Sequence, residues 1–175
     1  MKLAASQINA FLQNPAPAVR VILVYGPDAG LVSERATALA KKTVPDLNDP
    51  FCVALLTGSA LGESGSRLFE EMSAGSLLGG RRLVRLQHAV ESNAKVVEAL
   101  LDDLPRGDSL LLIEAGELEK RSKLRAACES SAPEVCAIPC YVEDGPARAR
   151  AIVDILRGEG LKVSSELVAL LSDML

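Results

Sequence analysis

The part of the sequence that comes nearest to a chemical motif is a glycine-rich turn after an apolar run. A phosphate-binding P-loop reads Gly-x4-Gly-Lys-Ser/Thr, because its glycines let backbone N–H groups approach phosphates and its lysine neutralises them. Counted from Gly26, the second glycine position holds Leu31 and the lysine position holds Val32, whereas Gly30 stands one residue early and Ser33 matches. The turn therefore predicts the frame of a nucleotide site without its charge, a degenerate P-loop.

Other groups that phosphoryl transfer requires are also missing from their expected places. Gln87 and His88 follow the third predicted strand, where a nucleotide hydrolase carries acidic metal-binding residues. Glu114 is the one acidic residue well placed at a strand end, and a loop or helix-capping role is its simpler interpretation. The sequence thus predicts no ATP hydrolysis, no catalytic residue, no metal site and no cofactor.

A second segment is of a kind that binds proteins rather than small molecules. Ser76, Leu77 and Leu78 follow a short predicted helix, and glycines stand on both sides of the leucine pair. The leucines either pack under the helix and seat the third strand, or project into an apolar pocket of a partner. A leucine pair in a turn is commonly buried in the core. A turn that packs in the core, however, gains little stability from so many glycines. Residues 76–78 are called the anchor segment below.

Basic residues follow the anchor segment directly. Arg81, Arg82 and Arg85 form either a solvated entrance to the third strand or a rim that recognises an acidic protein surface or DNA. A second basic stretch lies within 117–128, where two glutamates precede basic residues at i,i+4 spacing. That spacing predicts an exposed helix over 117–128.

Short apolar runs alternate with helical stripes along the chain. Strands are predicted at 19–25, 51–56, 83–86, 110–113 and 135–141. Because these strands alternate with helices, and the four buried-looking ones are apolar rather than alternating, they predict a parallel sheet with helices on both faces, an α/β fold. This pattern ends near residue 141, so residues 1–141 are predicted to form one domain. Residues 142–175 read as two helices, too few to close a core alone, so either they pack on the first domain or the chain is a fragment that ends inside a small all-α domain.

Composition excludes several classes of protein. The chain has 175 residues, 49% of them hydrophobic, which excludes a disordered chain. A net charge of −4, with three Phe, two Tyr and no Trp, disfavours a protein that holds nucleic acid by itself. The four cysteines form no Cys-x-x-Cys pair and are expected to be buried thiols of a reduced, cytoplasmic protein. No run approaches the roughly 18 apolar residues that a membrane span needs.

Three segments are similar to those of a known protein family: Leu23-Val-Tyr-Gly-Pro-Asp-Ala-Gly30, Ser76-Leu-Leu-Gly-Gly-Arg-Arg-Leu83 and Leu110-Leu-Leu-Ile-Glu114. In these segments, and over essentially the whole chain, the sequence resembles the delta subunit of the bacterial DNA polymerase III clamp loader. The resemblance implies an AAA+-like first domain with a P-loop-type five-stranded parallel sheet in the order 5-1-4-3-2. A small helical lid domain would follow.

The same resemblance implies a role in DNA replication. Ser76, Leu77 and Leu78 would bind the sliding clamp, with Arg81 and Arg82 at the rim, and would help to open it for loading on primed DNA. The partners would be the clamp, the other clamp-loader subunits and, through the assembled complex, DNA. The subunit would be non-catalytic within a holoenzyme whose activity is that of a DNA-directed DNA polymerase, a nucleotidyltransferase.

Two alternatives belong to other functional classes. A degenerate P-loop-like nucleotide-binding enzyme would need a lysine from elsewhere and a metal-binding acid such as Glu114. A flavodoxin-like regulatory domain would need acids after the first strand, where Asp28 stands alone. Saturable binding of an ATP analogue with Mg²⁺ would favour the enzyme.

Overall fold

The computed structural model describes residues 1–61, 65–75, 80–130, 132–141, 153, 156 and 164–174. The chain divides into two compact units, Met1–Cys140 and Tyr141–Leu175. In the second unit, helix α7 spans Ser165–Met174, and the Leu167 N–H donates to the Ser164 hydroxyl oxygen at 3.3 Å. The helix predicted just after residue 144 lies almost entirely outside the described residues.

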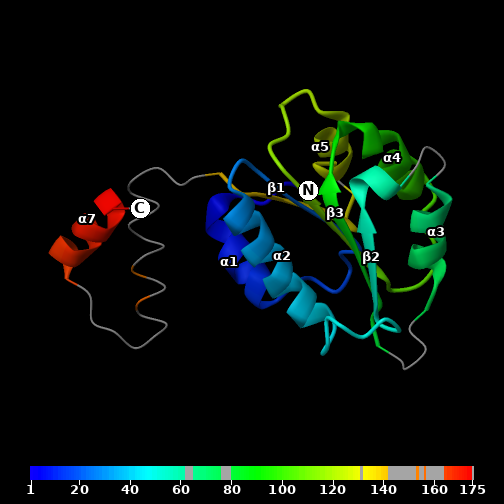
Figure 1. Cartoon of the computed structure of the whole chain (residues 1–175), viewed down its shortest axis with the longest axis horizontal. Helices are drawn as coiled ribbons and strands as arrows, with labels where there is room; N and C mark the ends of the chain where they lie inside the picture. Colours follow the sequence, from blue (N-terminus) through cyan, green and yellow to red (C-terminus); the bar gives the residue numbers. More distant parts are fainter. Residues whose placement is uncertain are drawn as a thin grey trace. The chain divides into compact units, whose positions relative to one another are not determined.

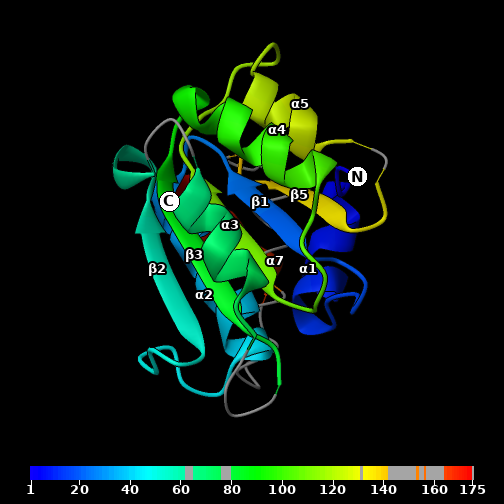
Figure 2. The ribbon, with the colours of Figure 1, turned by 90° about the vertical axis from the view of Figure 1, so that its right-hand side faces the viewer.

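The first unit is built on a five-stranded parallel sheet in the order β2-β3-β4-β1-β5 (Figures 1 and 2). This order puts β1 between β4 and β5 and confirms the predicted order and the AAA+-like α/β class. The strands are β1 Val21–Tyr25, β2 Val53–Thr57, β3 Leu83–Ala89, β4 Leu110–Ala115 and β5 Val135–Pro139.

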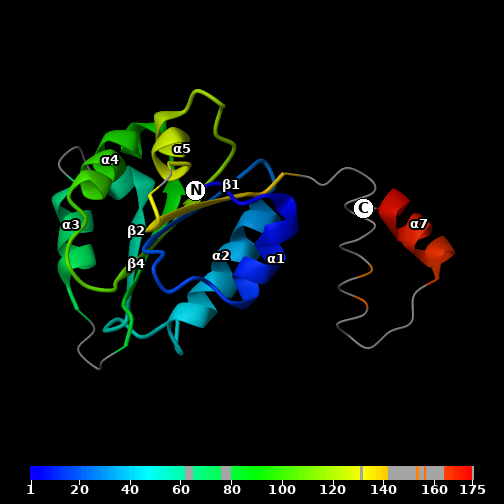
Figure 3. The same ribbon diagram turned by 180° about the vertical axis from the view of Figure 1, so that it is seen from behind.

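Helices cover both faces of this sheet. Helices α1 (Ala5–Gln13) and α2 (Ala29–Thr43) pack on one face (Figures 1 and 3). Helices α3 (Ser66–Ser73), α4 (Ala94–Asp102) and α5 (Lys123–Cys128) pack on the other. Two short 3₁₀ turns, Gly58–Ala60 and Glu91–Asn93, follow β2 and β3.

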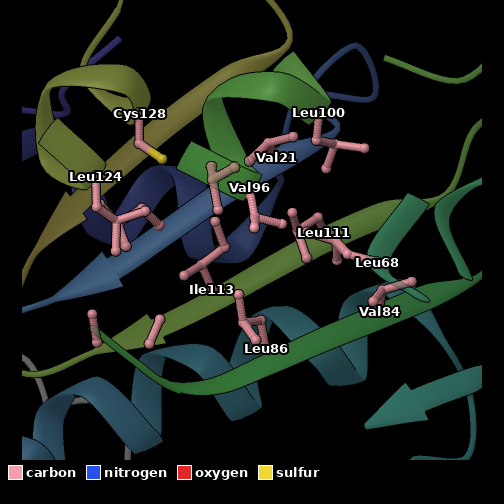
Figure 4. Close-up of a cluster of buried hydrophobic side chains, with 14 of the residues drawn as sticks. Val21, Leu68, Val84, Leu86, Val96, Leu100, Leu111, Ile113, Leu124 and Cys128 are labelled. Atoms are coloured by element: carbon pink, nitrogen blue, oxygen red, sulfur yellow. The ribbon is translucent and has the colours of Figure 1, made fainter. Parts of the chain in front are cut away.

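Each strand sends alternate side chains into two aliphatic clusters, as the pleat requires. From β1, Leu23 enters the cluster under α3, α4 and α5, which Figure 4 shows, whereas Val24 enters the cluster under α1 and α2. All four cysteines are buried thiols that form no disulfide. The prediction of fully buried strands holds for β1 and β4 but not for the edge strand β2, where Leu55 is 59% exposed.

The helix predicted over 117–128 is wrong in its first half, because α5 begins only at Lys123. The Ser122 hydroxyl caps it, and Glu91 accepts hydrogen bonds from that hydroxyl (2.5 Å) and from the Lys123 N–H (2.8 Å). These hydrogen bonds lower the pKa of Glu91. The ion pair that forms in the preceding loop joins Arg121 to Glu119, two residues away, rather than a partner one helical turn away. A long-range cap thus overrides the local i,i+4 pattern.

Candidate partner-binding site

The degenerate P-loop lies at the carboxyl edge of the sheet, between β1 and α2. Helix α2 begins at Ala29, so that Pro27 and Asp28 alone separate it from Gly26. The Asp28 carboxylate accepts a hydrogen bond from the Leu31 N–H at 2.9 Å. A phosphate bound at this helix end would need such N–H groups, and it would meet the charge of Asp28 there. Val32, at the lysine position, is buried in the core.

Backbone contacts close the space in front of this turn. The Gly26 N–H donates to the Gly116 carbonyl at 3.2 Å, which links the loops that follow β1 and β4. A Cβ on Gly26 would lie 1.9 Å from the Cys140 carbonyl oxygen, and the Cys140 N–H donates to the Tyr25 carbonyl at 2.7 Å. Open α/β sheets bind ligands at the carboxyl edge, where neighbouring strands connect to opposite faces. Here the Cys140 backbone packs directly against Gly26 at that edge.

Arg35 strengthens the closure, and sequence reasoning did not find it. This α2 residue is 9% exposed, and its Nη1 donates to the Pro139 carbonyl at 2.8 Å and lies 3.6 Å from the Cys140 Sγ. Burial raises the pKa of Cys140, although Arg35 opposes that shift. Because its partners lie at the distant end of β5, no local spacing indicates that Arg35 is buried.

The simpler interpretation of Glu114, a loop or helix-capping role, is wrong. Glu114 is a buried residue of β4, and its Oε1 accepts hydrogen bonds from Nε (2.9 Å) and Nη2 (2.6 Å) of Arg85 on β3. Arg85 is therefore paired within the sheet and does not form part of a solvated rim. Within the described part of the chain, no group of three or more His, Cys, Asp or Glu residues could hold a metal ion.

ATP is expected neither to bind nor to raise the melting temperature of this chain. Asp28 places a negative charge where phosphate would bind, and Val32 supplies no positive charge. A ligand present at 100 times its Kd would add about 2.7 kcal/mol of stability, which a thermal melt with Mg²⁺-ATP detects readily. A clear ATP-dependent rise would contradict this interpretation of the turn and favour the nucleotide-binding enzyme.

The described residues on either side of the anchor segment lie toward the opposite, amino edge of the sheet, because β3 begins at Leu83. Residues 76–79 lie outside the described residues, so the predicted roles of Ser76, Leu77 and Leu78 stay predictions. The described chain reaches Gly75 on one side and resumes at Gly80 on the other. A Cβ at either glycine would meet open space, but Gly80 has a φ of +79°, which favours glycine.

Both arginines after the anchor segment are held by groups of this chain. Arg81 donates from Nε to the Asp108 carbonyl at 2.6 Å and from Nη2 to the Val19 carbonyl. Burial lowers the pKa of Arg81; the charge of Asp108 opposes this shift and that of Arg20 adds to it. Arg82 donates from Nη1 to the Phe51 carbonyl and from Nη2 to the Glu71 carboxylate, each at 2.6 Å. Their contacts with a partner stay a prediction.

Comparisons with known proteins bear on the fold. No family model and no curated protein matches the sequence. The DNA clamp loader delta protein of Bacillus subtilis is similar in structure, with a TM-score of 0.70 and 16% identity over 96% of this chain and 51% of that one. A DNA polymerase III gamma subunit-related protein of Thermotoga maritima has a TM-score of 0.53 and 13% identity over 87% of this chain and 52% of its own.

The chain spans about half the length of these two solved proteins. Among the described residues, no helix has the length and apolar character to cross a membrane.

At identities of 16% and 13%, the likeness to these two solved proteins shows a shared fold. The resemblance to the clamp-loader delta family that the sequence indicated is confirmed at that level, and the chain has the AAA+-like α/β fold of clamp-loader proteins.

Proposed function

We propose that this chain is the clamp-binding part of a non-catalytic clamp-loader subunit in bacterial DNA replication. It would bind the ring-shaped sliding clamp through the anchor segment and help to open the ring for loading on primed DNA. Other subunits of a hetero-oligomeric cytoplasmic loader would hydrolyse ATP. The observation that supports this most is the fold shared with a clamp-loader delta protein, in which Asp28 accepts the Leu31 N–H and Val32 stands where a nucleotide site needs a lysine.

Ring opening in this proposal is a shift of populations rather than a chemical step. A ligand shifts a conformational equilibrium only by the difference between its affinities for the two states. The anchor segment would therefore bind more tightly to a clamp whose neighbouring interface is strained. Each buried leucine supplies roughly 1.5–3 kcal/mol of transfer free energy, so about 3–6 kcal/mol is the most that the two leucines could contribute to this difference in affinity.

Titration of a fluorescently labelled bacterial sliding clamp with this chain tests the proposal. We expect saturable binding in the absence of nucleotide and an unchanged Kd when Mg²⁺-ATP is added, because the turn is predicted to lack the positive charge that a phosphate needs. Absence of binding at concentrations of this chain well above those at which the assembled loader binds the clamp would contradict the proposed function. Binding that requires ATP would point instead to a functional nucleotide site.

A further inference from the structure

The described residues before and after the anchor segment share one set of contacts at the amino edge of the sheet. Before the segment, the Ala74 carbonyl accepts a hydrogen bond from the Ser109 hydroxyl at 3.3 Å. After the segment, Arg81 donates to the carbonyl of Asp108, the residue before Ser109, at 2.6 Å. The two residues that precede β4 therefore contact the chain both before and after the anchor segment. We call this set the anchor base; it consists of Glu71, Ala74, Arg81, Arg82, Asp108 and Ser109.

The ion pair between Arg82 and Glu71 directly joins the chain before the anchor segment to the chain after it. Glu71 lies in the last turn of α3, and Arg82 is the residue before β3. The side chain of Arg82 is 12% exposed and that of Glu71 is 24% exposed, and Nη2 of Arg82 lies 2.6 Å from the Glu71 Oε2. The other terminal nitrogen of Arg82 donates to the Phe51 carbonyl. Because both terminal nitrogens already have partners, Arg82 suits an internal brace better than a free rim contact.

We propose that Arg82 is a positioning residue for clamp binding, an inference that rests on the proposed function. With Glu71, it fixes the described chain on both sides of residues 76–79, from the last turn of α3 to the start of β3. Loops that are already held lose less conformational freedom on binding, and affinity rises accordingly. If the anchor base is rigidly joined to the sheet, the anchor segment can also bind the open ring more tightly than the closed one. A flexibly attached segment would bind both rings equally.

Two substitutions loosen the base without touching the leucines. Glu71→Gln removes the charge of the pair, and Arg82→Lys keeps the charge but cannot contact Glu71 and the Phe51 carbonyl together, because lysine lacks the planar fork. Ser109→Ala provides an independent route, since it removes the hydroxyl that holds Ala74. Glu114→Gln is the matched control. It breaks the similarly buried Arg85–Glu114 pair of the same sheet, which has no partner in the anchor base.

Two measurements on each purified variant test the proposal. We expect Glu71→Gln and Arg82→Lys to speed amide hydrogen exchange in the peptide 74–82 without clamp present. We also expect both to weaken clamp binding by about tenfold, a change of 1.4 kcal/mol. Glu114→Gln should lower the melting temperature yet leave that exchange and the Kd unchanged, a difference that general destabilisation would not produce.

The outcomes separate the positioning role from the proposed function. Unchanged affinity in Glu71→Gln and Arg82→Lys, when loss of the leucines abolishes binding, would overturn the positioning role and leave the proposed function standing. Equal weakening by Glu114→Gln would overturn it too, because the effect would then follow stability. A wild-type chain that does not bind the clamp would overturn both, whatever the exchange of peptide 74–82.

Discussion

Replacement of Leu77 and Leu78 together by alanine is expected to weaken binding to the sliding clamp by well over tenfold. Central apolar anchors typically cost at least about 2 kcal/mol each when truncated, and every 1.4 kcal/mol is a factor of ten in Kd. The measurement is the same clamp titration as for the wild type. An unchanged Kd in a folded variant would remove the anchor segment from the proposed interface.

The melting temperature of the same double variant decides between the two interpretations that the sequence left open. A projecting tip adds little to the core, so we expect almost no change. Leucines packed in the core would leave cavities, and their loss would cost about 4 kcal/mol or more. Leu55→Ala is a suitable control, because Leu55 is an exposed leucine of β2. It should change neither stability nor clamp affinity.

Gly26→Ala is expected to destabilise the protein by about 3 kcal/mol or more, at or beyond the usual upper end for overpacking. The added Cβ would lie 1.9 Å from the Cys140 carbonyl oxygen. That carbonyl cannot move aside cheaply, because the Cys140 N–H is bonded to the Tyr25 carbonyl. At this chain length the melting temperature should fall by roughly 6–12 °C, which differential scanning calorimetry measures directly.

Gly116→Ala is the matched control for this prediction. Gly116 lies in the neighbouring loop and accepts the Gly26 hydrogen bond, but a Cβ there would meet nothing within 4 Å. We expect a shift of no more than about 0.5 kcal/mol, as for an ordinary surface substitution. If Gly26→Ala melted like the wild type, the Cys140 backbone would not hold the turn as tightly as the 1.9 Å approach requires.

The sequence predicts the parts of this fold that depend on local pattern. The apolar run at β1 is visible because that strand is buried on both faces, and the helical stripe of α2 is visible because burial of one face repeats every three to four residues. The order of the strands came from the family resemblance, since nothing in the composition of β1 places it beside β4 and β5. The start of α5 was mispredicted because Glu91, far away in the sequence, supplies its cap.

The candidate site shows the same division between local and long-range information. Spacing alone revealed the missing lysine at Val32 and the leucine pair between glycines. It could not show that Arg82 is paired with Glu71, or that Glu114 is paired with Arg85, because each pair forms only when separate elements pack together. Charged side chains near a strand entrance look solvated in a sequence until their partners are known.

Photo-crosslinking from position 76 tests the central claim most directly. A photoreactive residue in place of Ser76 leaves both leucines intact, and the same residue in place of Val90, which is 50% exposed after β3, serves as the control. We predict a crosslink to the sliding clamp from position 76 that excess wild-type chain suppresses, and none from position 90. A complex that forms without any crosslink from position 76, or with equal crosslinks from both positions, would contradict the account.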